Sequence, residues 1–397
     1  MRIKKDVCII GGGIMGFSSA YYLSKEHRSC VVLEMKDIGN GASAACDDMI
    51  MMQAKQIGTN LLFGLEALEL FRGLESELRQ DIAFYMCGGM VLIDDEQTLQ
   101  KMESFVTRQQ ALGLNVRIVE NQELFRMQPN INRCIRASTY CPQDAHIDPL
   151  LLLYAYAKNA QRLGTEVIRG AAVCTLNRKS THWEVLTKEG HLIEAECVLI
   201  AAGAWSQQLG QSIDVNLPVR PRKGHILITE PIPELSPTHL WSAAYIASKL
   251  GENTVPNRAP YEEEIGHGFV FSRSYKGNHL LGGSRQYAGF DKNVDVRVMD
   301  VILKYAQHYV PKLAHVNIIR AIANFRPSTP DGKAIIGPVD GRDGLFVLTG
   351  HEGDGISLAP LMGRAIAGMI CGHPTDRRFE EYNQRRFRQS GSVQNDK

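Results

Sequence analysis

Three glycines with fixed spacing near the start of the chain are the first residues that could do chemistry. Gly11, Gly13 and Gly16 form the pattern G-x-G-x-x-G. In such a turn the first glycine allows a tight bend, and the second lets a diphosphate approach the backbone. The third lets a helix and a strand pack closely. The pattern alone is a weak signal, because glycine is frequent in this chain.

The residues around the glycines turn the weak pattern into a strong one. Residues 7–10 and 30–33 are continuous apolar runs typical of buried strands, and residues 14–25 have helical character. The second run ends in Glu34, which would accept hydrogen bonds from ribose hydroxyls. The helix N-terminus would offer N–H groups to a diphosphate. We therefore expect a dinucleotide site, against the alternative of a turn that binds nothing. NAD and FAD both carry ADP, so this motif does not choose between them.

Two further glycine-rich turns could reach the same ligand. The apolar run 198–200 ends in a turn of small residues at 201–206, for which an ordinary strand end is the alternative. Residues 350–355 precede an expected helix over about 356–370, whose N-terminal dipole would favour negative charge on a ligand. Gly363 and Ala367 share one face of that helix and would permit close contact with a strand.

Arg326 is the candidate for capturing a carboxylate. It is followed by Pro327, Pro330 and Gly332, which indicate a rigid turn. A planar guanidinium held in such a turn suits bidentate binding of a substrate carboxylate. The alternative is an ion pair with a nearby acid such as Asp331.

Composition limits the other functions. The chain has 397 residues and a formal net charge of +1, which gives no electrostatic reason to expect nucleic acid or a membrane surface. No apolar run reaches the roughly 20 residues of a transmembrane helix, and no secretory signal is recognised. The nine cysteines occur singly, without a CxxC pair, which favours a reducing compartment and offers no metal site. We expect a cytoplasmic protein with one large or two interleaved domains.

Three more helices are expected to frame these motifs. Leucines and Phe71 recur at helical spacing over residues 61–78, and a second helix is expected over 96–112. Asp148 and Pro149 are typical of an N-cap and a first helical residue, with the helix continuing to about Arg162. Residues 218–319 are rich in strand-like patterns.

Taken together, the segments resemble the D-amino-acid-oxidase-like (DAO) superfamily of FAD enzymes. That superfamily includes glycine oxidase, sarcosine oxidase, D-amino-acid dehydrogenase and the flavin subunits of opine and D-hydroxyproline dehydrogenases. The resemblance covers nearly the whole chain and is specific because the segments occur in order. They are the N-terminal turn with Glu34, and residues 41–43, 144–149, 201–206, 221–225, 282–284, 326–338 and 350–360.

The resemblance implies an α/β fold with two domains. One is a Rossmann-like FAD-binding domain, with a parallel sheet between helices, assembled from residues 1–80, 141–218 and 321–390. The other is a substrate-binding domain rich in β-sheet, from residues 81–140 and 219–320. Residues 391–397 are expected to form a flexible tail.

The resemblance also implies oxidation of the C–N bond of a small amino acid to an imine, with hydride passing to flavin N5. The substrate would be a D-amino acid, an N-alkylated amino acid, a hydroxyproline or an opine. Arg326 would bind the carboxylate, while His351 and Lys223 are further catalytic candidates. His351 and Glu352 could each be a substrate contact, a proton relay or a loop hydrogen bond. Lys223 could support the reduced ring or be a surface lysine. The expected FAD contacts are Gly11, Gly13, Ile14, Met15, Gly16, Glu34, Ala42, Ser43, Ala202, Gly203, Trp205, Gly350, Gly353, Asp354, Gly355 and Ile356.

One segment departs from the superfamily pattern and keeps other functions open. Where many relatives have Asn and two glycines, this chain has Cys46, Asp47 and Asp48, followed by a Met-rich run that we expect to fill a core. Two acids beside a flavin would oppose electron uptake unless hydrogen-bonded or pointed away. The chain could instead be a flavin-carrying, electron-relaying subunit with an iron–sulfur or second flavin partner chain. An NAD-dependent dehydrogenase is a third alternative, and an oligomer is compatible with the sequence.

Overall fold

The computed structural model describes residues 1–250 and 259–387 and divides into two units. The first unit comprises Met1–Ala44, Leu152–Pro221 and Arg326–Lys397, and the second comprises Ala45–Leu151 and Arg222–Phe325. Both units are therefore discontinuous in sequence, as the resemblance implies. The boundaries differ from those expected, because residues 45–80 and 141–151 lie in the second unit. The expected tail, residues 391–397, lies outside the described residues.

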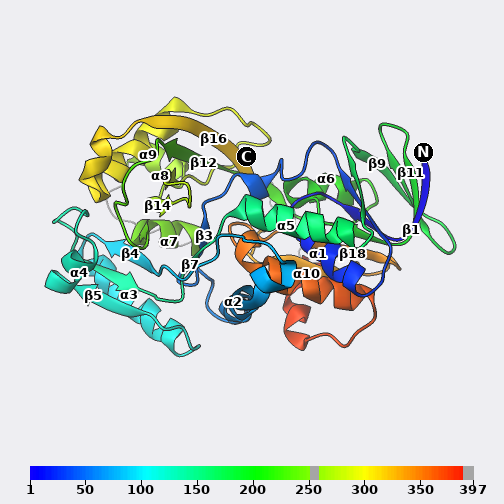
Figure 1. Cartoon of the computed structure of the whole chain (residues 1–397), viewed down its shortest axis with the longest axis horizontal. Helices are drawn as coiled ribbons and strands as arrows, with labels where there is room; N and C mark the ends of the chain where they lie inside the picture. The colour runs from blue at the N-terminus through cyan, green and yellow to red at the C-terminus, as the bar shows by residue number, and fades with distance from the viewer. Residues whose placement is uncertain (251–258, 388–397) are drawn as a thin grey trace. The chain divides into compact units, whose positions relative to one another are not determined.

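The first unit is built around an eight-stranded sheet whose centre is parallel (Figure 1). Its main order is β17-β18-β11-β1-β2-β8, with β10 and β9 continuing antiparallel from β11. The pairs β1–β2, β1–β11, β11–β18 and β2–β8 are parallel. The strands are β1 (Arg2–Ile10), β2 (Cys30–Glu34), β8 (Glu166–Arg169), β9 (Val173–Arg178), β10 (Trp183–Thr187), β11 (Leu192–Ile200), β17 (Ile335–Pro338) and β18 (Leu345–Thr349).

The apolar runs form the centre of this sheet because a parallel strand is covered on both faces. The last four residues of β1 and all five of β2 are buried. Cys8, Val31, Val198 and Val347 all belong to one hydrophobic cluster. The two expected strands that flank the glycine turn are thereby confirmed.

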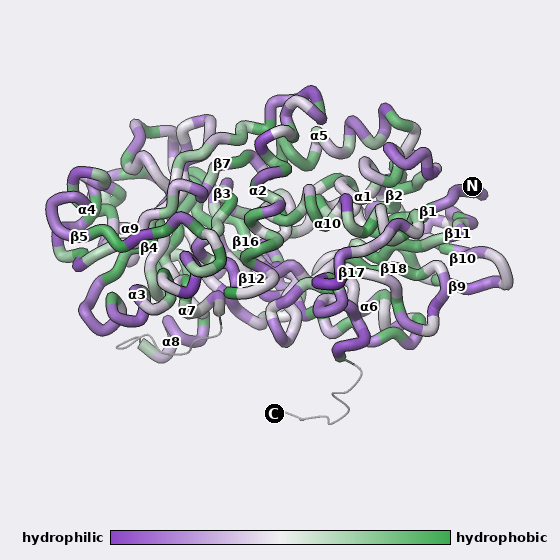
Figure 2. Tube along the Cα trace, turned by 90° about the horizontal axis from the view of Figure 1, so that it is seen from below, coloured by the Kyte–Doolittle hydropathy of each residue, from purple (hydrophilic) through white to green (hydrophobic). Residues whose placement is uncertain are grey.

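Helices α1 (Ile14–Lys25) and α10 (Gly355–Ile370) pack directly on each other in the first unit. A Cβ added to Gly363 would lie 2.5 Å from Ser18 Oγ and 2.9 Å from the Ser18 backbone carbon. Gly363 therefore does permit a close contact, but its neighbour is helix α1 rather than the expected strand. The tube in Figure 2 shows the hydrophobic character of α10, against the hydrophilic connection between β9 and β10. The unit also contains α6 (Ser206–Gln211) and short 3-10 turns at Ala42–Ala44 (η1), Gly203–Trp205 (η2), Arg377–Tyr382 (η4) and Gln384–Phe387 (η5).

The second unit is built on a mostly antiparallel eight-stranded sheet of order β16-β12-β15-β14-β13-β4-β6-β5, in which only β13 and β4 pair in parallel among the described pairs. A two-stranded ribbon of β3 and β7 accompanies it. The strands are β3 (Met49–Ile50), β4 (Gly89–Ile93), β5 (Arg117–Glu120), β6 (Ala137–Tyr140), β7 (Ala145–His146), β12 (Arg220–Thr229), β13 (His239–Ser242), β14 (Val270–Arg273), β15 (His279–Gly282) and β16 (Ile318–Ser328). The helices are α2 (Thr59–Leu78), α3 (Glu96–Gln110), α4 (Asn121–Met127), α7 (Ala243–Leu250), α8 (Pro260–Glu264) and α9 (Val296–Tyr309), with a 3-10 turn at Pro311–His315 (η3).

Helix positions follow the sequence signals closely. The observed α1 has the expected bounds, and α2 and α3 differ from expectation by two residues at one end. Asp148 caps α5 (Pro149–Arg162) as expected, since its Oδ1 accepts from the N–H groups of Leu150 (2.8 Å) and Leu151 (2.9 Å). Among the helices of the described residues, none has both the length and the apolar character needed to cross a bilayer. The expected mixed α/β fold with a β-rich second part is confirmed.

A buried polar network fixes the loop after β3 in the second unit. Asp144 is fully buried, and its carboxylate accepts from the N–H of Met52 (2.6 Å) and from Gln53 Nε2 (2.6 Å). Gln53 Nε2 also donates to the carbonyl of Gly89 (2.9 Å). Burial raises the pKa of Asp144 to about 6, although these donors and the charge of Lys55 act in the opposite direction. The Met-rich run lies beside this network and fills a core, as expected, with Met49 and Met51 in one cluster.

Two stacked histidines lie in the same unit. The ring of His146 packs between Tyr85 (4.7 Å between ring centroids) and His239 (5.8 Å). Within the part of the chain that the structure describes, neither ring nitrogen of His146 has a hydrogen-bond partner. Burial lowers the pKa of His146 to about 4 and that of His239 to about 3. Both rings are therefore neutral in the fold.

The α1–α10 contact can be tested with two glycines of one helix. We expect Gly363→Ala to destabilise the protein by about 1–3 kcal/mol, because the new methyl overlaps Ser18. Gly368→Ala is the control, since a Cβ there meets only His373 at ordinary contact distance, so the better helix former should be neutral or stabilising. Thermal unfolding followed by circular dichroism measures both. Equal melting temperatures for the two variants would contradict the close contact.

The neutral histidines predict a loss of stability in acid. The pKa of His146 is about 4 in the fold against about 6.5 when unfolded, so the unfolded chain takes up the proton first as pH falls. Stability present above pH 6.5 is then lost between about pH 6.5 and 4, by roughly 3 kcal/mol for this residue. Urea unfolding of His146→Phe across that range should show a shallower loss than the wild type. Exposed His315→Gln should keep the wild-type slope, and a wild-type slope in His146→Phe would refute the assignment.

Candidate functional site

The N-terminal glycine turn has the geometry that its sequence pattern predicts. Gly11 has a φ of +118°, and a Cβ there would lie 2.4 Å from the carbonyl oxygen of Ala201. A Cβ on Gly16 would lie 1.9 Å from the carbonyl oxygen of Gly11. Both positions therefore require glycine, the first for its conformation and the second for the close approach of α1 to the turn after β1.

Gly12 and Glu34 form a pair that the sequence analysis missed. The N–H of Gly12 donates to Glu34 Oε2 at 2.8 Å, and the N–H of Lys36 donates to Oε1 at 2.9 Å. A Cβ on Gly12 would lie 2.9 Å from the Glu34 Cβ. The run of three glycines contained the signal, but the G-x-G-x-x-G pattern leaves this middle position free. Glu34 is nearly buried at 8% exposure, so its carboxylate is oriented before any ribose arrives.

The first turn of α1 faces a second short segment of the same unit. The helix begins after Gly13, which provides no side-chain cap, and the N–H of Ile14 donates to Ser43 Oγ at 3.0 Å. Ser43 lies in η1 with Ala42. The first unit thus gathers a helix N-terminus whose N-cap is a glycine, an oriented carboxylate and a glycine-rich turn, which together fit the diphosphate and ribose of an ADP group.

The turn that follows β11 packs against the N-terminal glycine turn. The same Cβ on Gly11 would lie 3.2 Å from Ala202 Cα, and one on Gly41 would meet the ring of Trp205 at 3.7 Å. Thr349 at the end of β18 donates to the carbonyl of Gly203 at 3.0 Å. The three predicted segments around residues 11, 202 and 349 are therefore adjacent in the first unit.

The C-terminal glycine-rich loop approaches both α1 and the strand that carries Arg326. A Cβ on Gly350, whose φ is +76°, would lie 2.6 Å from Thr329 Cγ2. The N–H of Glu352 donates to the carbonyl of Pro327 at 2.9 Å. A Cβ on Gly355 would lie 3.8 Å from Met15 Cε. This loop leads into α10, whose N-cap Asp354 makes no side-chain cap bond, so N–H groups at its start, beginning near Ile356, stay available to a ligand.

Arg326 lies near the end of β16 and is partly exposed. The alternative of an Arg326–Asp331 pair is wrong, because Asp331 is bound by Arg386 Nε at 2.8 Å and Nη2 at 3.2 Å. Burial would raise the pKa of Asp331, but these hydrogen bonds and the charge of Arg386 lower it overall. Asp331 is thus assigned to a different arginine.

The other two catalytic candidates are buried. Lys223 is 3% exposed, so the alternative of a surface lysine is wrong, and its Nζ donates to Asp291 at 2.8 Å. His351 is 5% exposed and lies in the loop beside Glu352. The structure brings Arg326, His351 and the loop 350–355 together in the first unit. Lys223 belongs to the second unit, where its charge is paired.

The departing segment contains one buried acid. Asp48 is 7% exposed, and its pKa is raised well above the ordinary value by burial and by the neighbouring charges of Asp148 and Asp47. Cys46 is a free, partly buried thiol. These residues begin the second unit, and any role toward a cofactor remains a prediction.

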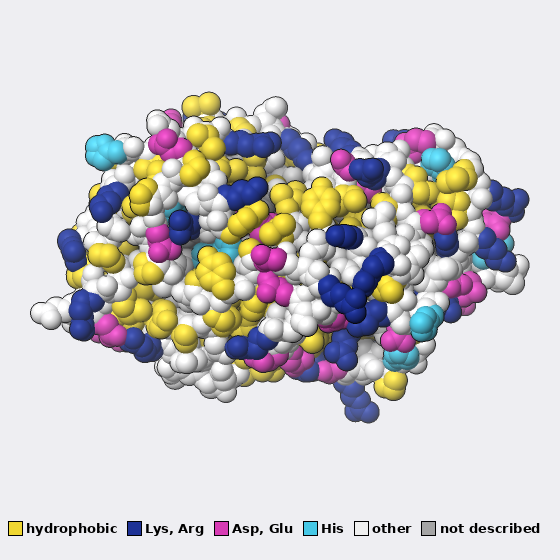
Figure 3. Space-filling view, viewed as in Figure 1, with side chains coloured by type: hydrophobic (Ala, Val, Ile, Leu, Met, Phe, Trp, Pro, Cys, Tyr) yellow, Lys and Arg dark blue, Asp and Glu magenta, His cyan; other side chains and the backbone are white. Residues whose placement is uncertain are grey.

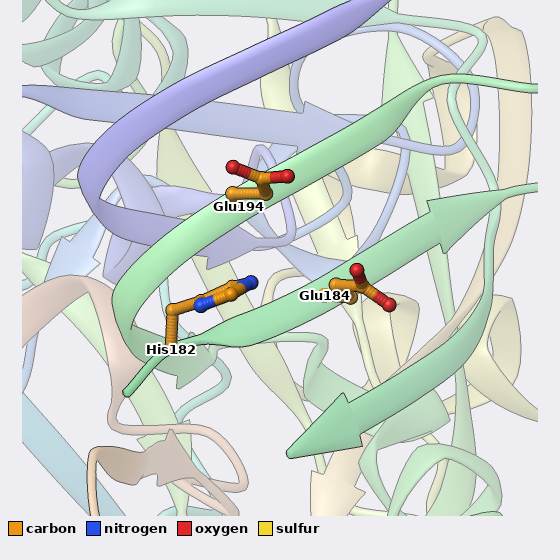
Figure 4. A group of neighbouring side chains, drawn as sticks. All are labelled: His182, Glu184 and Glu194. Atoms are coloured by element: carbon orange, nitrogen blue, oxygen red, sulfur yellow. The ribbon is translucent and has the colours of Figure 1, made fainter. Parts of the chain in front are cut away.

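Among the described residues, one group of three side chains could hold a metal ion (Figure 4). His182 and Glu184 project from the β10 end of the hairpin beside Glu194 of β11, with ligand atoms within 4.8 Å of one another. Glu194 is paired with Arg2 and Glu184 with Lys179 (3.2 Å). Since both carboxylates already have cationic partners, we interpret this group as part of a surface ion-pair network.

The surface carries charges of both signs. Figure 3 shows lysines and arginines distributed among aspartates and glutamates over the visible face. Charges of both signs on this face are consistent with the formal net charge of +1.

Comparisons with known proteins agree with this geometry. Residues 6–369 match the family model described as DAO, FAD dependent oxidoreductase. The glycine oxidase of Geobacillus kaustophilus is 28% identical over 379 residues, which cover 93% of this chain and 94% of that protein. The hydrogen cyanide synthase subunit HcnC of Pseudomonas protegens is 27% identical over 408 residues, covering 92% of each chain.

A solved structure shows the same fold. The crystal structure of glycine oxidase from Geobacillus kaustophilus matches with a TM-score of 0.87 at 24% sequence identity. The match covers 96% of this chain and 98% of that one. The fold of this chain is therefore similar to that of the solved glycine oxidase over both units.

The role of Glu34 in cofactor binding can be tested by removing its carboxylate. We expect Glu34→Ala to weaken FAD binding about ten- to hundredfold, because a charge-assisted hydrogen bond contributes roughly 1.5–3 kcal/mol. The dissociation constant, measured by titrating apoprotein with FAD and following flavin fluorescence, checks this. Exposed Glu26→Ala is the matched control at the other end of α1. Unchanged affinity in Glu34→Ala would remove Glu34 from the cofactor site.

Proposed function

We propose that this chain, which belongs to the DAO family of FAD dependent oxidoreductases, oxidises the C–N bond of a small amino acid to an imine. The observation that carries the proposal is the contact between the Arg326 strand and the loop 350–355. Because the Glu352 N–H donates to the Pro327 carbonyl at 2.9 Å, the residue next to Arg326 and the loop before α10 lie together in the first unit, which supports a substrate site there.

Binding and orientation are the main tasks of this chain's own residues. Arg326 would bind the substrate carboxylate with two parallel N–H donors, which fixes the direction of the α-carbon. Arg386 holds Asp331, so that acid does not compete for Arg326. A substrate amine that arrives neutral needs no strong general base, and we assign none.

Charge stabilisation is the second task. When bound, FAD supplies the acceptor for the hydride, which carries both electrons removed from the substrate. The uncapped N-terminus of α10 would stabilise negative charge through its dipole and backbone N–H groups. Gly11, Gly12 and Gly16 allow the turn to close tightly against its neighbours, and Glu34 would bind the ribose.

The finer identity of the substrate belongs to the proposal. Glycine oxidase among the relatives acts on an amino acid by name, which supports a small amino or N-alkylated amino acid. D-amino acids, hydroxyproline and opines are the other classes that the superfamily resemblance suggests. We place the reaction in the cytoplasm, as the cysteine pattern favours.

A second candidate function is supported by one relative. HcnC is named as a subunit of hydrogen cyanide synthase, so a related chain acts within an assembly. The present chain could likewise carry FAD and relay electrons to an iron–sulfur or second flavin chain. Co-purification of such a partner, together with no turnover by the isolated polypeptide in the presence of oxygen, would favour this candidate.

An anaerobic reduction screen tests the proposal directly. The purified protein should be yellow, and the right compound among glycine, N-methyl amino acids, D-amino acids, hydroxyprolines and opines should bleach the flavin absorbance. The assay follows only the reduction of the bound flavin and needs no further electron acceptor. It therefore identifies the substrate under both candidate functions. A flavin-loaded protein that no amine or amino acid reduces would refute C–N oxidation.

Arg326 provides the matching variant. We expect Arg326→Ala to raise KM and lower kcat/KM by an amount equivalent to about 2–5 kcal/mol, because a buried carboxylate would lose its charged partner. Arg326→Lys should recover only part of this loss, since an ammonium cannot make the planar two-bond contact. Steady-state kinetics with the best substrate of the screen measure both variants. Wild-type kinetics in Arg326→Ala would exclude it from the site.

A further inference from the structure

Glu352 occupies a backbone position at which glycine is favoured. Its φ is +52°, in the left-handed region that non-glycine residues adopt at a cost of about 1 kcal/mol or more. Gly350, Gly353 and Gly355 surround it in the same short loop, so the chain uses glycine freely here. A side chain kept at such a position indicates a task for the side chain itself.

The position of Glu352 relative to Arg326 suggests that task. Its N–H lies 2.9 Å from the carbonyl oxygen of Pro327, the residue that follows Arg326. Glu352 and Arg326 are both partly exposed, so neither side chain is fully enclosed by the protein. The carboxylate of Glu352 accepts from the Gly353 N–H at 2.5 Å, which keeps it over the loop.

We propose that Glu352 is a specificity-determining residue that selects substrates with a single carboxylate and disfavours dicarboxylates. The inference rests on the proposed function, in which Arg326 binds one carboxylate of an amino acid. The neutral amine of the same substrate would donate a hydrogen bond to the carboxylate of Glu352. A second carboxylate near Glu352 would meet a charge of the same sign and would be repelled.

This inference divides the substrate classes that the superfamily resemblance leaves open. Glycine, its N-methyl derivatives and the hydroxyprolines carry one carboxylate and satisfy both charged residues. Opines and iminodiacetate carry at least two carboxylates and place an unpaired negative charge near Glu352. The selection is achieved mainly by repulsion of the wrong ligand, so it should be released when the charge is removed.

The test uses two unreactive ligands that differ by one carboxylate. Methoxyacetate has one carboxylate, and diglycolate, the oxygen analogue of iminodiacetate, has two. Their dissociation constants are measured on the FAD-loaded protein by the change in flavin absorbance and by calorimetry. We expect diglycolate to bind the wild type more weakly than methoxyacetate. Glu352→Gln should tighten diglycolate binding about ten- to hundredfold and leave methoxyacetate nearly unchanged.

A second variant separates charge from backbone conformation. Glu352→Gly also removes the charge, but it relieves the left-handed φ and should not lower the melting temperature. Both variants should show the same shift in ligand preference. The ratio of kcat/KM for sarcosine to kcat/KM for iminodiacetate should change in the same direction in both variants. Glu26→Gln changes an exposed acid of the same unit at the C-terminal end of α1, whereas Met15 near the N-terminal end of α1 is the residue close to Gly355, so this variant should keep the wild-type ratio.

The outcomes distinguish this inference from the proposed function. If methoxyacetate binds and an amino acid bleaches the flavin, but neither Glu352 variant changes the preference, the role of Glu352 is wrong and C–N oxidation stands. If no carboxylate binds the wild type and no amine reduces it, the proposed function fails first. Should Glu352→Gln lose FAD, the preference of Glu352→Gly decides the question alone.

Discussion

The close contact of α1 with α10 is the constraint on which the candidate site depends. Gly363 leaves no room for a side chain against Ser18, so the two helices meet at backbone distance. Helices are rigid over these lengths, and their N-termini are therefore fixed relative to each other, with Gly355 close to Met15. Two helix N-termini from opposite ends of the sequence are consequently held close together within one unit.

Charge in the first unit is distributed to complement a ligand with several charged groups. Two helix N-termini provide partial positive charge, and Arg326 adds a full one at the end of β16. Glu34 and Glu352 provide negative charge at separate places, each held by a backbone N–H. The diphosphate of FAD suits the positive ends of the two helices, and a substrate with one carboxylate and one amine would suit Arg326 and Glu352.

The sequence predicted elements better than pairings. Apolar periodicity indicated α2 because its buried leucines and Phe71 recur at helical spacing, and Asp148 could be identified as a cap from its neighbour Pro149. The Gly12–Glu34 and Asp331–Arg386 pairs were missed, because each joins residues that the fold, rather than local sequence, brings together. The boundary at Ala44 was missed for the same reason: residues 45–52 are held by Asp144 and by pairing of β3 with β7.

The departing segment illustrates how burial can change the meaning of a residue type. In the sequence, two adjacent acids suggested a negative charge that would oppose electron uptake by a flavin. In the structure, burial and the charges of Asp148 and Asp47 raise the pKa of Asp48 well above its ordinary value, which favours its neutral form. A protonated carboxyl adds no charge and can donate a hydrogen bond. The argument that an acid in this segment would oppose electron uptake by a flavin therefore does not apply to Asp48 in its neutral form.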